Sequence, residues 1–387
     1  MPTSPMHRKS HPILMLAFAF LIAFLLHLLL FSTAPMVSVI MEEMGLSYTE
    51  FGLVFSVAMI SLILFRIPWG LVGDRLGYLN ALRIALPISA ISAVLRALTS
   101  GYVPFLVGQF ILGVGLASVL PCLPLMIKEW TPKNVGLGTG IYVSGFAAGN
   151  ATALALTPHL IEVLAWRNVL LVYGGFAALV SLLWWALAKS TIRITPSFRL
   201  DNFTNIIRDK YVWILLLLMA AAMGSYDTLA TWLPKVLELK NINPVYASLL
   251  ALGFFLAGPV VGFFLDRFWN KSIILMLLGT IASISIAGIN YAPFPLLGML
   301  IVLSGFMLIG VLTISLTVPT EHKRFSKSVA TVVGVTSSLS NFGPFLIPIV
   351  FGFLMDITGS HYASIFAVAI FAGFSFILGS RVIDLKH

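Results

Sequence analysis

The chain has 387 residues, of which 59% are apolar and 10% are charged, and its mean hydropathy is +1.02. Soluble domains carry about 25% charged residues, so this composition excludes a soluble globule and predicts a polytopic membrane protein. The net charge is +9 and there is one cysteine, Cys122, which excludes an intrachain disulfide.

Apolar runs of about 20 residues or more, the length needed to cross a bilayer, predict an all-α membrane protein with twelve transmembrane helices. The runs fall at 12–38, 50–73, 80–99, 103–127, 135–160, 166–189, 212–236, 245–265, 272–291, 294–319, 327–355 and 361–382. The first run is too long for the apolar core of a signal peptide, and Pro35 would follow the cleavage site directly. We therefore expect two six-helix halves, 1–189 and 212–387, joined by a cytoplasmic connector at 190–211.

Lysine and arginine are unequally distributed between the two sides of this predicted bundle. Of the 23 basic residues, eighteen lie on the side of both termini, four lie on the other side, and Arg66 lies inside a run. The positive-inside rule predicts a plasma-membrane protein with both termini in the cytoplasm. The basic charge is thus a signal of topology, and we expect lipid rather than nucleic acid around the chain.

One motif occurs twice. The second and third runs are joined by Gly70-x-x-x-Asp74-Arg75-x-Gly77, and Gly262-x-x-x-Asp266-Arg267 repeats most of it 192 positions later. Glu129 and Glu321, each at the end of a later run, are separated by the same 192 positions. The common spacing predicts two parallel repeats with a binding site between them near the membrane midplane.

This motif resembles the loop signature between helices 2 and 3 of the major facilitator superfamily, although Tyr78 stands where that family has basic residues. The resemblance implies its transporter fold and a monomer without a cofactor. It also implies that Asp74 and Asp266 each hold a helix N-terminus of the opposite half, and that Arg75–Glu129 and Arg267–Glu321 form cytoplasmic ion pairs. The alternative is that these charges are only solvated. The implied gating residues are Gly70, Asp74, Arg75, Gly77, Glu129, Gly262, Asp266, Arg267 and Glu321.

Arg66 lies eight residues before Asp74, which is roughly 12 Å deeper in the membrane at 1.5 Å per residue. A charge at this depth costs at least about 2.5 kcal/mol, so it faces a cavity or a partner. Arg66-x-Pro68-x-Gly70 is similar to the helix-2 signature of nitrate/nitrite porters, whose arginine holds the anion, and the cyanate-type transporters have a related pattern. Their second arginine is replaced here by Gly258. The alternative for Arg66 is a structural pair with Asp227 or a carbonyl group.

His27 and Asp227 are ionisable residues near the middle of two runs that the repeat makes equivalent, and Asp227 is a candidate for proton coupling. A packing role is the alternative for His27. The segments 145–150 and 340–343 resemble helix-5 and helix-11 segments of the same porters. Glycines in 113–115 and 136–140 predict close helix packing or hinges. The candidate substrate-binding residues are Arg66, His27, Asp227, Tyr226, Tyr142, Asn150 and Asn341.

These features favour secondary active transport of a small inorganic or carboxylate anion by rocker-switch alternating access. The alternative is a proton-coupled symporter or antiporter of a neutral or cationic organic solute, drug efflux included. Drug/proton antiporters carry an arginine in helix 4, where this chain has Gln109. The sequence has no His-Glu-x-x-His, Gly-x-Ser-x-Gly or phosphate-loop motif, so we expect neither an enzyme nor an ATP-driven pump.

Overall fold

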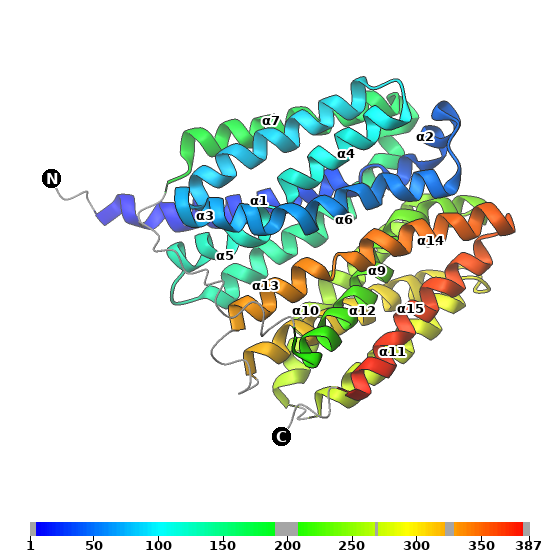
Figure 1. Ribbon diagram of the computed structural model, residues 1–387. Helices are drawn as coiled ribbons and strands as arrows, with labels where there is room; N and C mark the ends of the chain where they lie inside the picture. The colour runs from blue at the N-terminus through cyan, green and yellow to red at the C-terminus, as the bar shows by residue number, and fades with distance from the viewer. Residues whose placement is uncertain (1–4, 190–207, 268–269, 322–328, 382–387) are drawn as a thin grey trace. The chain divides into compact units, whose positions relative to one another are not determined.

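A computed structural model describes residues 5–189, 208–267, 270–321 and 329–381 (Figure 1). Within these ranges the chain forms helices and short connections, without any strand. The predicted connector lies almost wholly outside the described residues. The all-α architecture predicted from the sequence is confirmed.

The helices follow the predicted apolar runs closely. In the first part of the chain they are α1 (Pro5–Phe31), α2 (Val37–Met44), α3 (Tyr48–Leu98), α4 (Tyr102–Leu116), α5 (Val119–Trp130), α6 (Val135–Val163) and α7 (Trp166–Leu187). In the second part they are α9 (Lys210–Leu239), α10 (Leu249–Arg267), α11 (Lys271–Gly288), α12 (Leu296–Glu321), α13 (Val329–Leu339), α14 (Phe342–Thr358) and α15 (His361–Arg381). Short 3-10 turns occupy Ala34–Met36 and Pro244–Ser248.

Helix α3 spans 51 residues, which is roughly 77 Å at 1.5 Å per residue and far longer than one membrane crossing. It is two helices joined at Gly77, whose φ of 80° and ψ of 151° are not helical. A φ in this range is favourable only for glycine. Gly77 thus separates the predicted runs 50–73 and 80–99, as the motif indicates.

Three other predicted runs are each broken once. The first is interrupted near Pro35, the fourth at Ser118, and the eleventh at Asn341. Among the described residues, nine helical stretches are long and apolar enough to cross a membrane. Counting α3 as two crossings and adding α6 and α10 is consistent with the twelve predicted.

The contacts divide the chain into two compact units. Unit 1 comprises residues 1–32 and 61–198, and unit 2 comprises residues 33–60 and 199–387. The first thirteen residues of α3, together with α2, therefore belong to unit 2, although they precede most of unit 1 in the sequence. The predicted halves differ from these units chiefly in this segment, Thr33–Ile60.

In unit 1, glycines allow α1 and α6 to pack closely. A Cβ atom added at Gly145 would lie 2.5 Å from the carbonyl oxygen of Phe20, and one at Gly149 would overlap the carbonyl group of Phe24. By contrast, a Cβ atom at Gly136 or Gly140 would meet no atom within 4 Å in the part of the chain that the structure describes. The packing interpretation of the glycines in 136–140 is thus wrong for these two residues.

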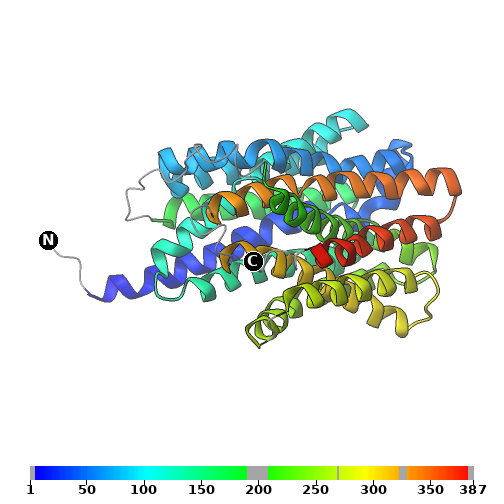
Figure 2. The same ribbon diagram turned by 60° about the horizontal axis from the view of Figure 1, so that its bottom comes forward.

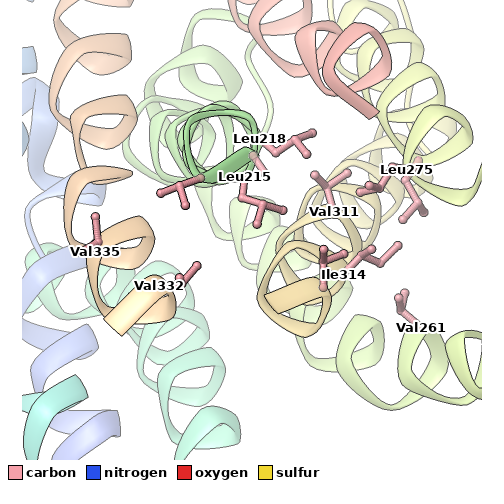
Figure 3. Close-up of a cluster of buried hydrophobic side chains, with 12 residues drawn as sticks. Leu215, Leu218, Val261, Leu275, Val311, Ile314, Val332 and Val335 are labelled. Carbon is pink, nitrogen blue, oxygen red and sulfur yellow. The ribbon is translucent and has the colours of Figure 1, made fainter. Parts of the chain in front are cut away.

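Unit 2 has its own apolar core (Figure 3). Leu215 and Leu218 of α9 lie close to Leu275 of α11 and to Val311 and Ile314 of α12, and all are buried. The turned view in Figure 2 shows α11 and α15 side by side, in agreement with their many contacts. Since lipid is as apolar as these side chains, van der Waals packing holds such a bundle together.

The N-terminus of α3 is capped from two sources within unit 2. Ser47 and Glu50 form a reciprocal capping box, in which the Ser47 amide donates to Glu50 Oε2 at 2.8 Å and the Glu50 amide donates to Ser47 Oγ at 3.2 Å. In addition, the Asp356 carboxylate at the end of α14 accepts hydrogen bonds from the Tyr48 amide at 2.9 Å and the Thr49 amide at 2.8 Å. A negative charge at a helix N-terminus also opposes the helix dipole favourably.

The same part of α3 is held by close backbone contact with α14. A Cβ atom at Gly52 would lie 2.6 Å from the carbonyl oxygen of Pro348, and one at Gly352 would overlap the backbone of Tyr48. Trp232 of α9 donates its indole N–H to the same Pro348 carbonyl at 3.1 Å and contacts Phe51 edge to face. Segment 33–60 is therefore fixed to the rest of unit 2 by backbone contacts, aromatic contacts and hydrogen bonds to a carboxylate.

We predict that Asp356→Asn lowers the melting temperature of the purified protein in detergent. The substitution replaces a charged double acceptor by an amide, and loss of a helix cap costs about 0.5–2 kcal/mol. Glu42→Gln is the matched control, because Glu42 is exposed on α2 in the same unit. Equal melting temperatures for the two variants would contradict a stabilising role for the Asp356 cap.

Candidate functional site

Arg66 lies on the part of α3 that belongs to unit 1, and this part is oriented by contacts with α4. Ser61 Oγ donates to the Phe110 carbonyl at 2.9 Å, and Trp69 Nε1 donates to the Val114 carbonyl at 2.7 Å. Phe65, halfway between them, packs edge to face on Phe110. Since residues four apart share a face, these contacts fix which side of α3 faces α4.

Arg66 occupies a different face of the same helix. It is only 9% exposed, whereas Leu64, Ile67 and Leu71 are between 40% and 54% exposed and form the side that faces away from the protein. At 100° per residue, Arg66 points roughly 100° or more away from each of these three side chains. The guanidinium group is therefore directed into the protein and not towards lipid.

Gly70 lies one turn below Arg66 on this inward face. A Cβ atom at Gly70 would meet no atom of the described residues within 4 Å, whereas one at Gly73, the next glycine on this face, would lie 3.8 Å from Cys122 Sγ. Open space thus adjoins the turn that follows Arg66. A planar, bidentate hydrogen-bond donor beside open space suits a small oxyanion.

The candidates on α1 and α6 form an aromatic group in unit 1. The His27 ring lies 4.3 Å from that of Phe146, and Tyr142 packs edge to face on Phe146 at 5.7 Å. Asn150, two turns from Tyr142, is completely buried, and neither polar atom of its side chain has a hydrogen-bond partner among the described residues. An unsatisfied buried amide destabilises the folded state by about 1–3 kcal/mol, so packing alone does not explain an asparagine at position 150.

The candidates on α9 lie in unit 2. Tyr226 is buried and packs edge to face on Phe254, while its hydroxyl and that of Ser225 have no partner among the described residues. Asp227 is half-buried, and no described residue of unit 2 donates a hydrogen bond to its carboxylate. Asn341 is different, because it lies in the break between α13 and α14 and its amide nitrogen donates to the carbonyls of Ser337 and Ser338 in the last turn of α13.

At the Gly77 turn, Tyr78 contacts Glu129, for which the resemblance implied Arg75 as the partner. Tyr78 is 1% exposed, and its hydroxyl donates to Glu129 Oε2 at 2.6 Å and accepts the indole N–H of Trp130 at 2.9 Å. Arg75 is exposed and forms no ion pair within the described part of the chain. The ion pair expected between Arg75 and Glu129 is therefore absent here.

The physical reason is the backbone of Gly77. Its left-handed φ reverses the course of the chain between Arg75 and Tyr78, so that the aromatic ring enters unit 1 and the arginine faces outward. Helix α5 ends one residue after Glu129, which places the carboxylate within reach of the Tyr78 hydroxyl. Asp74 is half-buried beside this turn.

The second copy of the motif is only partly described. Helix α10 ends at Arg267 and α12 ends at Glu321, so the repeated residues stand at helix ends, as Asp74 and Glu129 do near Gly77 and Trp130. The side chains of Asp266, Arg267 and Glu321 lie outside the described residues, as do the surroundings of Gly258 and Gly262. Their gating roles remain predictions.

The sequence reasoning missed Asp356, although a signal for it was present. Gly352-x-x-x-Asp356-x-x-Gly359 has the same spacing as Gly70-x-x-x-Asp74-x-x-Gly77, and Gly359 ends α14 with a left-handed φ of 64°. The Asp356 carboxylate caps the N-terminus of another helix, which is the role that the resemblance implied for Asp74. This second copy of the full spacing would have pointed to it.

A family model for the Major Facilitator Superfamily matches residues 19–339, so this chain belongs to that family of membrane transporters. It is accordingly a multi-pass membrane transporter and not an enzyme. The chain is 24% identical over 357 residues to a nitrite extrusion protein of Bacillus subtilis, with 89% of this chain and 88% of the relative covered. It is 25% identical over 385 residues to a D-galactonate transporter of Escherichia coli, with 88% of each covered.

A solved structure has the same fold. It is a bacterial homologue of the human lysosomal transporter Spinster in an inward-facing, unoccupied conformation. The two chains superimpose with a TM-score of 0.77 at 18% identity, with 98% of each covered. At this identity the likeness concerns the fold alone.

We predict that Tyr78→Phe destabilises the protein, because it removes the hydroxyl shared by Glu129 and Trp130. Two hydrogen bonds at about 0.5–1.5 kcal/mol each give an expected loss of about 1–3 kcal/mol. Arg75→Gln is the control, and we expect it to change stability by less than about 0.5 kcal/mol, as is usual at exposed positions. Thermal unfolding in detergent measures the stability of both variants. An equal loss of stability in Arg75→Gln would contradict this prediction and support the ion pair between Arg75 and Glu129 that the resemblance implied.

Proposed function

We propose that this transporter carries a small inorganic or carboxylate anion and that Arg66 binds it. The observation that carries the proposal is the placement of Arg66 on an inward face of α3, one turn from the open space at Gly70. The cost of keeping a charge at this depth is offset when an anion neutralises it. The guanidinium group offers two parallel N–H donors, which match the two oxygens of nitrite or of a carboxylate.

The relatives support this substrate class. One is named for nitrite, a small planar anion, and the other for D-galactonate, a sugar acid with one carboxylate. Both anions present two oxygens on one central atom, and these match the two parallel N–H donors of a guanidinium group. A single arginine could therefore bind either anion. The volume of the binding site beyond Arg66 would then determine whether the transporter selects a small inorganic anion or a sugar acid.

We further propose that the contact between α3 and Asp356 is part of the alternating-access cycle. Segment 33–60 precedes most of unit 1 in the chain, yet it is held on unit 2 through Tyr48, Thr49 and Gly52. The distribution of basic residues predicts that this end of α3 faces outward. Opening the outer side would require these hydrogen bonds to break, at a cost of a few kcal/mol that a shift between two populated states allows.

Asp227 is our candidate for a proton-coupling group. It lies 17 residues into the 30-residue helix α9, next to the buried hydroxyl groups of Ser225 and Tyr226. A carboxylate inside a membrane helix is usually linked to an ion or proton pathway. Coupling to protons would allow the carrier to accumulate its substrate, while exchange alone would not need it.

We predict that Arg66→Lys keeps the protein folded but weakens anion binding. A point-like ammonium group cannot reproduce the bidentate fork, so the loss should be about 1.5–3 kcal/mol, or roughly ten- to a hundred-fold in affinity. Arg66→Met should abolish binding without unfolding the protein. Calorimetric titration with sodium nitrite and sodium galactonate, together with melting temperatures, would measure both effects.

The same series tests the structural alternative for Arg66. If Arg66 is instead paired with Asp227, Arg66→Met strands a carboxylate and destabilises the protein, and adding Asp227→Asn restores stability. A stable Arg66→Met protein that binds nitrite or galactonate as the unaltered protein does would contradict both interpretations. His159→Gln, on α6, serves as a control for loss of a basic side chain that neither interpretation involves.

We also predict that Asp227→Asn abolishes proton-driven accumulation in proteoliposomes and leaves counterflow exchange intact. The amide cannot take up a proton, and exchange needs no net proton movement. The measurement compares uptake driven by an imposed pH gradient with counterflow at equal pH on both sides. Loss of counterflow as well would make Asp227 a substrate ligand or a structural residue.

A further inference from the structure

Arg96 is a second cation buried inside unit 1, on the other side of the Gly77 break from Arg66. It lies in the last turn of α3 and is 0% exposed. Its Nη1 atom donates to the Leu29 carbonyl of α1 at 3.2 Å and to Gln109 Oε1 of α4 at 3.1 Å. The guanidinium group thus joins three helices within one unit.

Most of the remaining hydrogen-bonding capacity of this pair is unused. Arg96 Nε and Nη2 have no partner among the described residues, and neither does Gln109 Nε2. Nε and Nη2 form one edge of the planar guanidinium group, with N–H bonds that point the same way. Since Gln109 must present its oxygen to Nη1, its amide nitrogen is fixed as a donor. Every open position of the pair is therefore a donor.

The charge of Arg96 also lacks compensation. The contacts of Arg96 are with one carbonyl oxygen and one neutral amide, and no described residue supplies it with a carboxylate. Further hydrogen bonds at this helix end involve Thr99, whose hydroxyl donates to the Arg96 carbonyl and whose own carbonyl accepts from Arg167. A water molecule would satisfy the donors but leave the charge, whereas an anion would satisfy both.

The second half of the chain shows that packing does not require this cation. A Cβ atom at Gly108 would lie 2.7 Å from Arg96 Cγ, so the stem of Arg96 fills the space left by this glycine. In the second half, 192 positions later, Gly288 corresponds to Arg96 and Leu300 corresponds to Gly108. A Cβ atom at Gly288 would lie 2.9 Å from Leu300 Cδ1, so here the glycine and the large side chain have exchanged helices. The equivalent helix pair, α11 and α12, therefore closes the same contact with an apolar side chain.

From these observations we propose that Arg96, held in place by Gln109, binds a small monovalent inorganic anion, such as chloride, between α1, α3 and α4. The Nε–Nη2 edge of Arg96 supplies two parallel donors, while Gln109 holds Nη1 from the other side. Leu29 lies two residues before the end of α1, and Arg96 two residues before the end of α3, so the site is near the ends of these helices. A bound anion would hold the three helices together and stabilise unit 1. This site is separate from Arg66 and does not depend on the transported substrate.

The test compares melting temperatures of the full-length protein in detergent with sodium chloride and with sodium isethionate, a salt that carries no carboxylate, at equal ionic strength. Chloride should raise the melting temperature of the unaltered protein in a saturable manner, as binding to the folded state alone requires. Arg96→Met should remove this dependence on chloride. Its linear apolar side chain should occupy the space beside Gly108, as Leu300 does beside Gly288.

Gln109→Glu gives the sharpest outcome, because it supplies the anion from the protein itself. We expect this variant to be as stable in isethionate as the unaltered protein is in chloride, and to be insensitive to chloride. Arg66→Met is the control and should keep the chloride effect. If the chloride effect is lost in Arg66→Met and kept in Arg96→Met, the anion acts at Arg66 and the proposal is overturned. It is equally overturned if chloride has no effect on the unaltered protein, or if Gln109→Glu lowers the melting temperature in both salts.

Discussion

The energetic cost of a charge within the membrane-spanning bundle is the constraint on which this molecule depends. Arg66 and Arg96 both lie on α3, both are buried, and each needs a compensating group. Leu62, at 6% exposure, and Trp69 cover the bundle side of the helix around Arg66, while Leu64 and Leu71 are exposed. The position of each arginine on α3 therefore determines its surroundings: Arg66 adjoins the open space at Gly70, and Arg96 is enclosed by α1 and α4.

The same constraint shapes the backbone. Helices in lipid must satisfy their own polar groups, so the breaks near Pro35, Ser118 and Asn341 are closed by local hydrogen bonds. Ser118 Oγ donates to the Gly115 carbonyl, and the amide nitrogen of Asn341 donates to two preceding carbonyls. Glycine lets helices approach elsewhere, as at Gly145 and Gly52. The capped start of α3 at Asp356 follows the same rule at a helix end.

Much of the architecture was predictable because apolar length, basic residues and a repeated motif are strong signals. Gly77 separates two helices as predicted, and Glu129 stands at a helix end as the repeat required. The partner of Glu129 was not predictable, since it depends on how the backbone at Gly77 turns Tyr78 inward. The spacing of residues shows which of them share a helix face, but not which other helices they contact. The unpaired Nε–Nη2 edge of Arg96 could therefore be found only from the structure.

The central claim is that the chain transports a small anion, and counterflow measures this most directly. Proteoliposomes preloaded with unlabelled solute would be exposed to labelled nitrite, nitrate or galactonate, and to labelled neutral sugars and organic cations. We predict exchange with one or more of the anions, and no exchange in liposomes without the protein. Exchange of an organic cation or a neutral sugar, with none of any anion, would contradict it.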